Sequence, residues 1–251
     1  MNNEKQTGRV LAVGMGPGGQ PGMTAEAWAA LERADVLCGY RGYIELVRPL
    51  FPDKPVLSSG MTQEEDRCHA ALRSAASGNI VAMICSGDAG VYGMAGLLLE
   101  LLPGYAGVEL EVLPGVTAAL SGAALLGAPL MHDFAVVSLS DLLTPWPAIE
   151  KRLRLAAQAD FVLCLYNPAS RTRKHHLRRA VDILLAAGLP PERACGWARQ
   201  IGREGQESGV LTLQELRGHP ADMFTTVFVG KSDTRMLGDK LLTPRGYQNK
   251  T

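Results

Sequence analysis

The sequence has few cysteines, no excess charge of either sign and no long apolar run, and each absence excludes a class of protein. The five cysteines are odd in number, widely spaced and without a C-x-x-C pair, so we expect neither a disulfide framework nor a metal site. Basic and acidic residues number 25 each, which leaves no net field to hold a nucleic-acid backbone. No stretch reaches the roughly 18 uninterrupted apolar residues that a membrane-spanning helix needs.

The composition predicts a folded protein. Residues 1–7 are polar and carry no apolar segment typical of an export signal, so we expect a cytoplasmic location. With 47% hydrophobic and 20% charged residues, the chain can bury a real core, which excludes intrinsic disorder. A length of 251 residues is compatible with one large unit or two smaller ones.

Apolar, strand-like runs alternate with helical patterns along the chain, which predicts an α/β fold with mostly parallel sheets. The expected strands are 9–15, 35–38, 54–57, 80–85, 108–113, 134–138, 161–166, 194–198, 209–212 and 225–230. Thr62 and Glu65 match a capping box that would open a helix ending at Gly78. A second helix is expected over 171–187, before Gly188.

The predicted domain boundary lies near a Gly- and Ala-rich helical segment over 117–126 that connects two halves rich in strands and helices. We therefore expect an N-terminal α/β domain over residues 8–116 and a C-terminal α/β domain over residues 117–247.

A glycine-rich loop follows the first strand and matches G-x-G-x-x-G at Gly14, Gly16 and Gly19. In a nicotinamide or flavin site, that loop opens directly into a helix, and an acidic residue ends the second strand. Here Pro21 interrupts the segment after the glycines, and the second strand runs into Cys38-Gly39-Tyr40. A dinucleotide site is thus disfavoured, although a ligand at the carboxyl end of the strand is expected.

Asp88 lies between two glycines after the fourth expected strand. Its carboxylate could accept hydrogen bonds from ribose hydroxyls or pair with an amino group, and the plainer alternative is a cap on the next helix. Thr117 follows Pro114-Gly115 at the end of the fifth strand. Three loops are therefore expected to converge on one edge of a sheet.

These three loops together resemble the tetrapyrrole methylase family. The matching segments are Val13-Gly14-Met15-Gly16-Pro17-Gly18, Ser86-Gly87-Asp88 with Tyr92-Gly93, and Pro114-Gly115-Val116-Thr117-Ala118. Four further segments are similar to the branch of that family that methylates C17 of precorrin-3B in cobalamin synthesis. They are 122–134, 138–146, 166–170 and 243–247.

The resemblance implies two α/β domains with S-adenosylmethionine in a cleft between them, usually in a homodimer. It also implies a set of cofactor-binding positions, in which Asn167 stands where many relatives carry methionine. These positions are Gly16, Pro17, Gly18, Ser86, Gly87, Asp88, Val91, Tyr92, Thr117, Ala118, Tyr166, Asn167, Gly202 and Thr225.

Methyl transfer from a sulfonium is an in-line displacement, which needs orientation and exclusion of water more than a nucleophilic side chain. In this branch, the resemblance also implies a ring contraction that expels C20 and moves protons, so an acid or base near the substrate is expected. The ordinary alternatives are a structural His–Asp pair and turn capping by the serines. The candidates are His132, Asp133, Ser138, Ser140 and Asp141.

A tetrapyrrole with several carboxylates needs local positive charge on a neutral protein. The run over 171–179 is the densest in basic residues, and the simplest interpretation is a solvated helix face. Cations in the first turn of that helix would favour a nearby anion. The candidates for substrate binding are Arg41, Arg48, Arg171, Arg199 and Arg203.

Other functions stay open at this point. The alternatives are a methylase acting at C11 or C20 in the same pathway and a non-catalytic tetrapyrrole-binding protein. An RNA ribose methylase is disfavoured because no basic stripe is evident. The sequence does not distinguish a metal-free substrate from a cobalt-loaded one.

Overall fold

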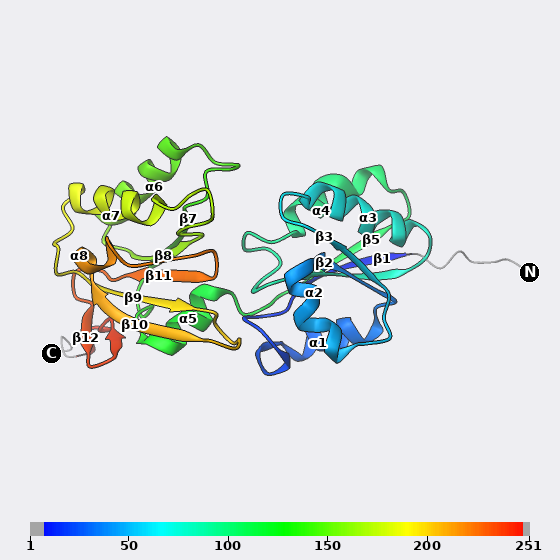
Figure 1. Ribbon diagram of the computed structural model, residues 1–251, viewed down its shortest axis with the longest axis horizontal. Coiled ribbons are helices and arrows are strands. Elements are labelled where there is room, and N and C mark those ends of the chain that lie inside the picture. Colours follow the sequence, from blue (N-terminus) through cyan, green and yellow to red (C-terminus); the bar gives the residue numbers. More distant parts are fainter. Residues whose placement is uncertain (1–7, 248–251) are drawn as a thin grey trace, which may run out of the picture. The chain divides into compact units, whose positions relative to one another are not determined.

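The computed structural model describes residues 8–247 and divides into two compact units, each with its own sheet (Figure 1). The first unit ends at Thr117 and the second begins at Ala118. Residues 1–7, which include the polar N-terminal segment, and residues 248–251 lie outside the described part of the chain.

The sheet of the first unit is fully parallel, in the strand order β3-β2-β4-β1-β5. Parallel neighbours need crossover connections, and helices supply most of them. The strands are β1 (Arg9–Gly14), β2 (Val36–Tyr40), β3 (Val56–Ser59), β4 (Ile80–Cys85) and β5 (Glu109–Leu113). The helices are α1 (Ala25–Arg33), α2 (Arg41–Val47), α3 (Glu64–Ala76) and α4 (Ala95–Leu101), with short 3₁₀ turns at Gln20–Gly22, Arg48–Leu50 and Leu102–Gly104.

Helices cover both faces of this sheet (Figure 1). On one face, Leu72 of α3 and Leu98 of α4 pack on residues of the sheet such as Met83. On the other face, Leu31 of α1 and Val47 of α2 pack in a second core. Because both faces are buried, the central strands are apolar throughout, which is why the sequence pattern located them well.

The sheet of the second unit is mixed, in the order β10-β9-β11-β8-β7. Its strands are β7 (Phe134–Ser138), β8 (Val162–Tyr166), β9 (Ala194–Arg199), β10 (Glu207–Thr212) and β11 (Thr225–Val229). Only β7 and β8 pair in parallel among these neighbours. The expectation of mostly parallel pairing is therefore wrong for this unit. The short connection over 200–206 joins β9 and β10 as a hairpin, and β11 runs antiparallel to both β8 and β9.

Helices lie on both faces of the second sheet as well (Figure 1). Leu153 and Leu184 pack on one face, and Phe228 packs beside Leu126 on the other. The helices are α5 (Ala118–Leu126), α6 (Trp146–Gln158), α7 (His176–Ala186) and α8 (Leu213–Leu216). A small sheet in the order β12-β13-β6 adds three short strands that the sequence pattern did not predict: β6 (Gly127–Ala128), β12 (Arg235–Leu237) and β13 (Lys240–Leu242).

Two helix starts differ from expectation. The predicted capping box is absent at α3, where Thr62 has a φ of 62° and Gln63 is the N-cap without a side-chain bond. Helix α7 begins at His176, five residues after the predicted position, so Arg171 and Arg173 precede its first turn. Both helices end close to the predicted glycines, Gly78 and Gly188, which have φ values of 98°.

All five cysteines are free and buried. Burial raises the pKa of the Cys38 and Cys164 thiols to about 12, so these groups stay protonated near neutral pH. No helix within residues 8–247 is both long enough and apolar enough to span a bilayer.

Candidate active site

The carboxyl ends of β1, β4 and β5 bring three glycine loops into backbone contact. Gly16 and Gly87 exchange two backbone hydrogen bonds of 3.0 and 2.8 Å. A Cβ atom on Gly115 would lie 2.1 Å from the Gly87 carbonyl oxygen and 2.5 Å from that of Gly14. No side chain fits at these contacts, so the glycines are required for the loops to meet. The predicted convergence of the three loops on one edge is confirmed.

Asp88 ties two of these loops together. Its Oδ1 accepts hydrogen bonds from the amides of Gly90 (2.8 Å) and Val91 (3.1 Å), and its Oδ2 accepts one from Gly115 (2.9 Å). The alternative that it caps the next helix is wrong, because α4 begins only at Ala95. The three amides leave one carboxylate lone pair free to face a ligand.

Tyr92 lies on the same loop in a conformation that side chains rarely adopt. Its φ is 54° and the residue is 57% exposed. Strained residues of this kind concentrate at functional sites. Pro17, at the next loop, packs beside Gly22, where an added Cβ would lie 3.1 Å from the proline ring.

In the second unit, β7, β8 and β9 end, and β11 begins, at one edge of the sheet. The Tyr166 hydroxyl accepts a 2.6 Å hydrogen bond from the amide of Ala119 in the first turn of α5. Asn167 has a φ of 53° and donates from Nδ2 to Ser138 Oγ at 3.0 Å. Ser138 also accepts from the Ser140 amide at 3.2 Å. Side chains therefore organise this edge.

Asp141 follows this serine turn and faces His176, which the sequence analysis did not single out. Asp141 Oδ2 lies 3.1 Å from His176 Nε2, and this contact holds the pKa of the Asp141 carboxyl below its usual value. The imidazole packs edge-on against Trp146 at 4.8 Å, and the Arg179 guanidinium lies 4.0 Å from that indole ring. The signal that could have found His176 is its position: it opens the helix after the loop that leaves β8.

Arg199 and Thr225 share a third cluster at this edge. Arg199 Nε donates to Asp222 Oδ2 at 2.8 Å, and the Thr225 hydroxyl donates to Asp222 Oδ1 at 2.9 Å. Burial opposes ionisation of Asp222, but the bonds from Arg199 and Thr225 outweigh it and lower the pKa of that carboxyl. These contacts already occupy Arg199, so its predicted role toward substrate stays a prediction.

Two other predicted positions lie in the turn after β9. Gly202 has a φ of 69°, and its amide donates to Gln206 Oε1 at 2.8 Å. The Arg203 guanidinium lies 5.6 Å from the Phe224 ring. Their predicted ligand contacts stay predictions.

His132 and Asp133 lie at the opposite end of β7 from Ser138. Five residues of extended chain separate Asp133 from Ser138, about 16 Å. Both residues are exposed. The structure therefore joins Ser138, Ser140 and Asp141 but leaves His132 and Asp133 apart from them.

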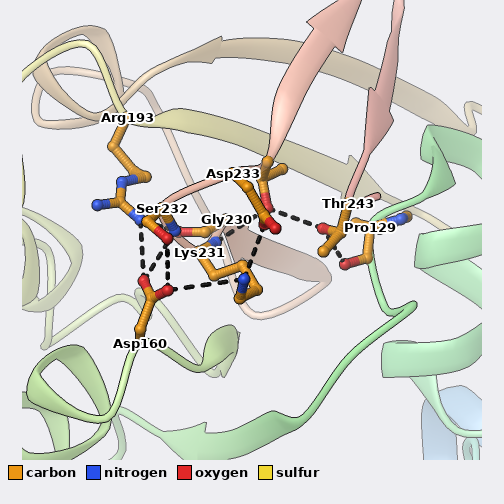
Figure 2. A network of polar contacts seen from close by, with 9 residues as sticks. Pro129, Asp160, Arg193, Gly230, Lys231, Ser232, Asp233 and Thr243 are labelled. Atoms are coloured by element: carbon orange, nitrogen blue, oxygen red, sulfur yellow. Dashed lines mark hydrogen bonds and ion pairs between the residues drawn. The ribbon is translucent and has the colours of Figure 1, made fainter. Parts of the chain in front are cut away.

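That opposite end of the sheet carries a polar network of its own (Figure 2). Asp160 accepts from the amide and hydroxyl of Ser232 at 2.8 and 2.6 Å, and Arg193 lies 3.4 Å away. Thr243 is fully buried; its hydroxyl donates to the Pro129 carbonyl at 2.6 Å and lies 2.7 Å from the hydroxyl of Thr234. Figure 2 shows Asp160 facing Ser232 and Lys231, with Thr243 beside Pro129.

The four segments that suggested the C17 branch therefore form two pairs. Residues 122–134 and 243–247 meet through Thr243 and through Arg245, whose guanidinium donates to the Met131 carbonyl at 3.0 Å. Residues 138–146 and 166–170 meet through the Asn167–Ser138 bond at the other end. The first pair has a structural role, and the second lies at the candidate site.

The remaining predicted arginines, Arg41, Arg48 and Arg171, are exposed, and no bond of their guanidinium groups is found within residues 8–247. No cluster of three or more histidine, cysteine or acidic side chains in the same part of the chain is arranged to hold a metal ion.

Comparison with known proteins identifies the class. The model of the Tetrapyrrole (Corrin/Porphyrin) Methylases matches residues 9–217. The chain belongs to this family, as its loops predicted.

Individual relatives narrow the comparison from the family to one branch of it. The chain is 49% identical over 236 residues to a probable cobalt-factor III C(17)-methyltransferase of Salmonella typhimurium, covering 94% of this chain and 98% of the relative. It is 40% identical to a precorrin-3B C(17)-methyltransferase of Sinorhizobium sp, covering 96% and 98%. The crystal structure of the methyltransferase CobJ superposes with a TM-score of 0.87 at 40% identity, covering 94% of this chain and all of that one. The predicted α/β class and methyltransferase activity are confirmed.

Proposed function

We propose that this protein transfers a methyl group from S-adenosylmethionine to C17 of precorrin-3B or of its cobalt-containing counterpart, with contraction of the macrocycle to the precorrin-4 level. The main support for this proposal is the similarity of the chain to two relatives over almost their full length. Both relatives are named as C17-methyltransferases. One relative is named for a cobalt substrate and the other for a metal-free one, so the metal content of the substrate is left to experiment.

The edge of the first unit has the features that an adenosyl cofactor requires. Three loops meet without side chains at their contacts, which lets a ligand approach the backbone closely. Asp88 holds the amides of two loops in place and keeps one lone pair available for a ribose hydroxyl. When bound, the cofactor supplies an electrophilic methyl on its sulfonium.

We assign the cofactor to the predicted positions at this edge, together with the predicted positions of the second unit. In the first unit they are Gly16, Pro17, Gly18, Ser86, Gly87, Asp88, Val91, Tyr92 and Thr117. In the second they are Ala118, Tyr166, Asn167, Gly202 and Thr225.

The second unit supplies the side-chain chemistry. Asn167, held by Ser138, presents a fixed amide at the end of β8, and Asp141 stays ionised beside His176. An ionised carboxylate beside an imidazole can hold or move a proton during the rearrangement. His132 and Asp133 have no part in this proposal, because they lie at the far end of β7.

We further propose that the enzyme works in the cytoplasm as a homodimer. The five free thiols are compatible with a reducing compartment. Light scattering should give twice the 26.8 kDa mass of one chain, and cell fractionation should recover the protein with cytoplasmic markers.

The decisive experiment is mass spectrometry of the product. Purified protein is incubated with S-adenosylmethionine and, in separate reactions, with metal-free precorrin-3B and with cobalt-factor III. A gain of one methyl with the absorption spectrum of a contracted ring in either reaction supports the proposal and identifies the natural form. Cofactor binding without methyl gain in either reaction would move the substrate to C11 or C20 methylation or to tetrapyrrole binding alone.

A further inference from the structure

Two buried N–H donors at the edge of the second unit have no hydrogen-bond acceptor within the described residues. They are Arg173 Nε and His176 Nε2. His176 Nε2 has an ion-pair contact with the Asp141 carboxylate at 3.1 Å, whereas Arg173 Nε has no such contact within the described residues. Buried donors are almost always paired, and an unpaired one lowers stability. An acceptor from a ligand would complete the contacts of these two groups.

Charge around the two donors is out of balance. Arg173 and Arg179 carry positive charge, whereas Asp141 is the acid that contacts His176. The single acid of α6, Glu150, is paired with Arg154 at 2.7 Å. Arg179 lies over Trp146 instead of a carboxylate. Positive charge therefore exceeds negative charge in this cluster, which favours one more anionic group.

Helix α7 adds to this field. It begins at His176, its N-cap His175 makes no side-chain bond, and its first turn contains no acidic residue. Helix α3, by contrast, has Glu64, Glu65 and Asp66 in its first turn. Free amides and the helix dipole at the start of α7 favour an anion.

We propose that Arg173 and His176 form a subsite for one carboxylate of the tetrapyrrole substrate. This inference rests on the proposed function and names a part of its substrate site. A guanidinium and an imidazole N–H together match the two oxygens of a carboxylate. The subsite lies at the same edge as Ser138 and Asn167, so a carboxylate bound there would orient the macrocycle toward the predicted reacting region. Arg171, the exposed arginine of the same loop, stays a separate prediction for substrate binding.

The test compares neighbouring charges of the same loop. The variants are Arg173→Gln, Arg173→Lys and His176→Gln, with Lys174→Gln as the matched control, because Lys174 is exposed and loses the same charge. Binding of precorrin-3B and cobalt-factor III is followed by absorbance, S-adenosylmethionine binding by calorimetry, and folding by circular dichroism.

We expect Arg173→Gln to weaken tetrapyrrole binding at least about tenfold, since it removes a charge-assisted bond. The effect should appear in KM more than in kcat, Arg173→Lys should recover part of it, and cofactor affinity should not change. Lys174→Gln should stay within about twofold of the wild type. If His176→Gln does not fold, the tetrapyrrole affinities of the two Arg173 variants test the subsite on their own.

Three results would overturn the subsite. Tetrapyrrole binding by Arg173→Gln within twofold of the wild type would reject the subsite alone, as would a parallel loss of cofactor affinity. A wild-type protein that binds S-adenosylmethionine but neither tetrapyrrole would reject the proposed function and the subsite with it.

Discussion

The two units differ in the groups that hold the edge of each sheet together: backbone in the first and side chains in the second. In the first unit, loops meet through glycine backbone, and one carboxylate, Asp88, fixes the amides around it. In the second unit, side chains contact side chains, as in the Asn167–Ser138 hydrogen bond and the Asp141–His176 ion pair. A backbone cradle tolerates no added atom, whereas a side-chain site can change its contacts one residue at a time.

This difference fits a division of labour. A cofactor that is the same throughout a family suits a cradle built from backbone atoms, which do not depend on side-chain identity. A substrate that differs between family branches suits a site built from replaceable side chains. Substitutions should therefore affect the two edges in different ways, beginning with the largest expected effect.

Gly115→Ala should be the most damaging single change. Its methyl would lie 2.1 Å from the Gly87 carbonyl oxygen, so two loops must separate. We expect a loss of about 3 kcal/mol in the free energy of unfolding and no measurable S-adenosylmethionine binding. Urea unfolding and calorimetry measure both.

The matched control is Gly96→Ala in α4, where an added Cβ has no neighbour within 4 Å. This variant should bind cofactor normally and gain up to about 1 kcal/mol in stability, because alanine is the better helix former. Equal behaviour of the two alanine variants would contradict the backbone cradle.

Asp88→Ala should come next. The change leaves the amides of Gly90, Val91 and Gly115 without their acceptor. We therefore expect the free energy of unfolding to fall by about 2 kcal/mol.

 Calorimetry should show loss of S-adenosylmethionine binding, while circular dichroism should show that the fold is retained. Asp88→Asn keeps one acceptor oxygen and should fall between the alanine variant and the wild type. Unchanged cofactor affinity in Asp88→Ala would show that the loops hold their positions without the carboxylate.

Asn167 tests the second unit, where side chains should matter more than backbone. Its φ of 53° suits glycine, so Asn167→Gly keeps the backbone and loses only the bond to Ser138. Asn167→Ala also strains the backbone and should be about 1 kcal/mol less stable than the glycine variant. Both variants should lose methyl transfer to a similar extent, measured by product formation. Full activity in Asn167→Gly would assign this edge to backbone geometry as well.

The sequence predicted the first unit better than the second for a physical reason. Strands buried on both faces, such as β4, are continuous apolar runs with clear ends. The glycines that follow these strands indicate where the loops lie. Strand direction is not encoded in such runs, so the antiparallel pairing of β9 and β11 was missed. Strands of two or three residues, such as β6, leave no periodic pattern to read.

The candidate site shows the same limit. Asp88 was found because glycines flank it, and Asn167 because a family motif contains it. His176 was not found, because its contact with Asp141 joins residues 35 positions apart and depends on where α7 begins. Pairing of side chains across a sheet edge is a property of the tertiary structure.

The smallest expected effect concerns the Arg199–Asp222 pair, which is partly exposed. The folded state lowers the pKa of Asp222 below its value in the unfolded chain. The contribution of Asp222 to stability is therefore present above the unfolded pKa and is lost as the pH falls through the folded pKa. Asp222→Asn should lower the free energy of unfolding by about 1 kcal/mol or less at pH 7, because solvent screens the pair. Thermal unfolding between pH 7 and pH 3 should show the two proteins converging as the pH falls. A difference that persists at the acid end would mean that Asp222 does not stabilise the fold through its charge.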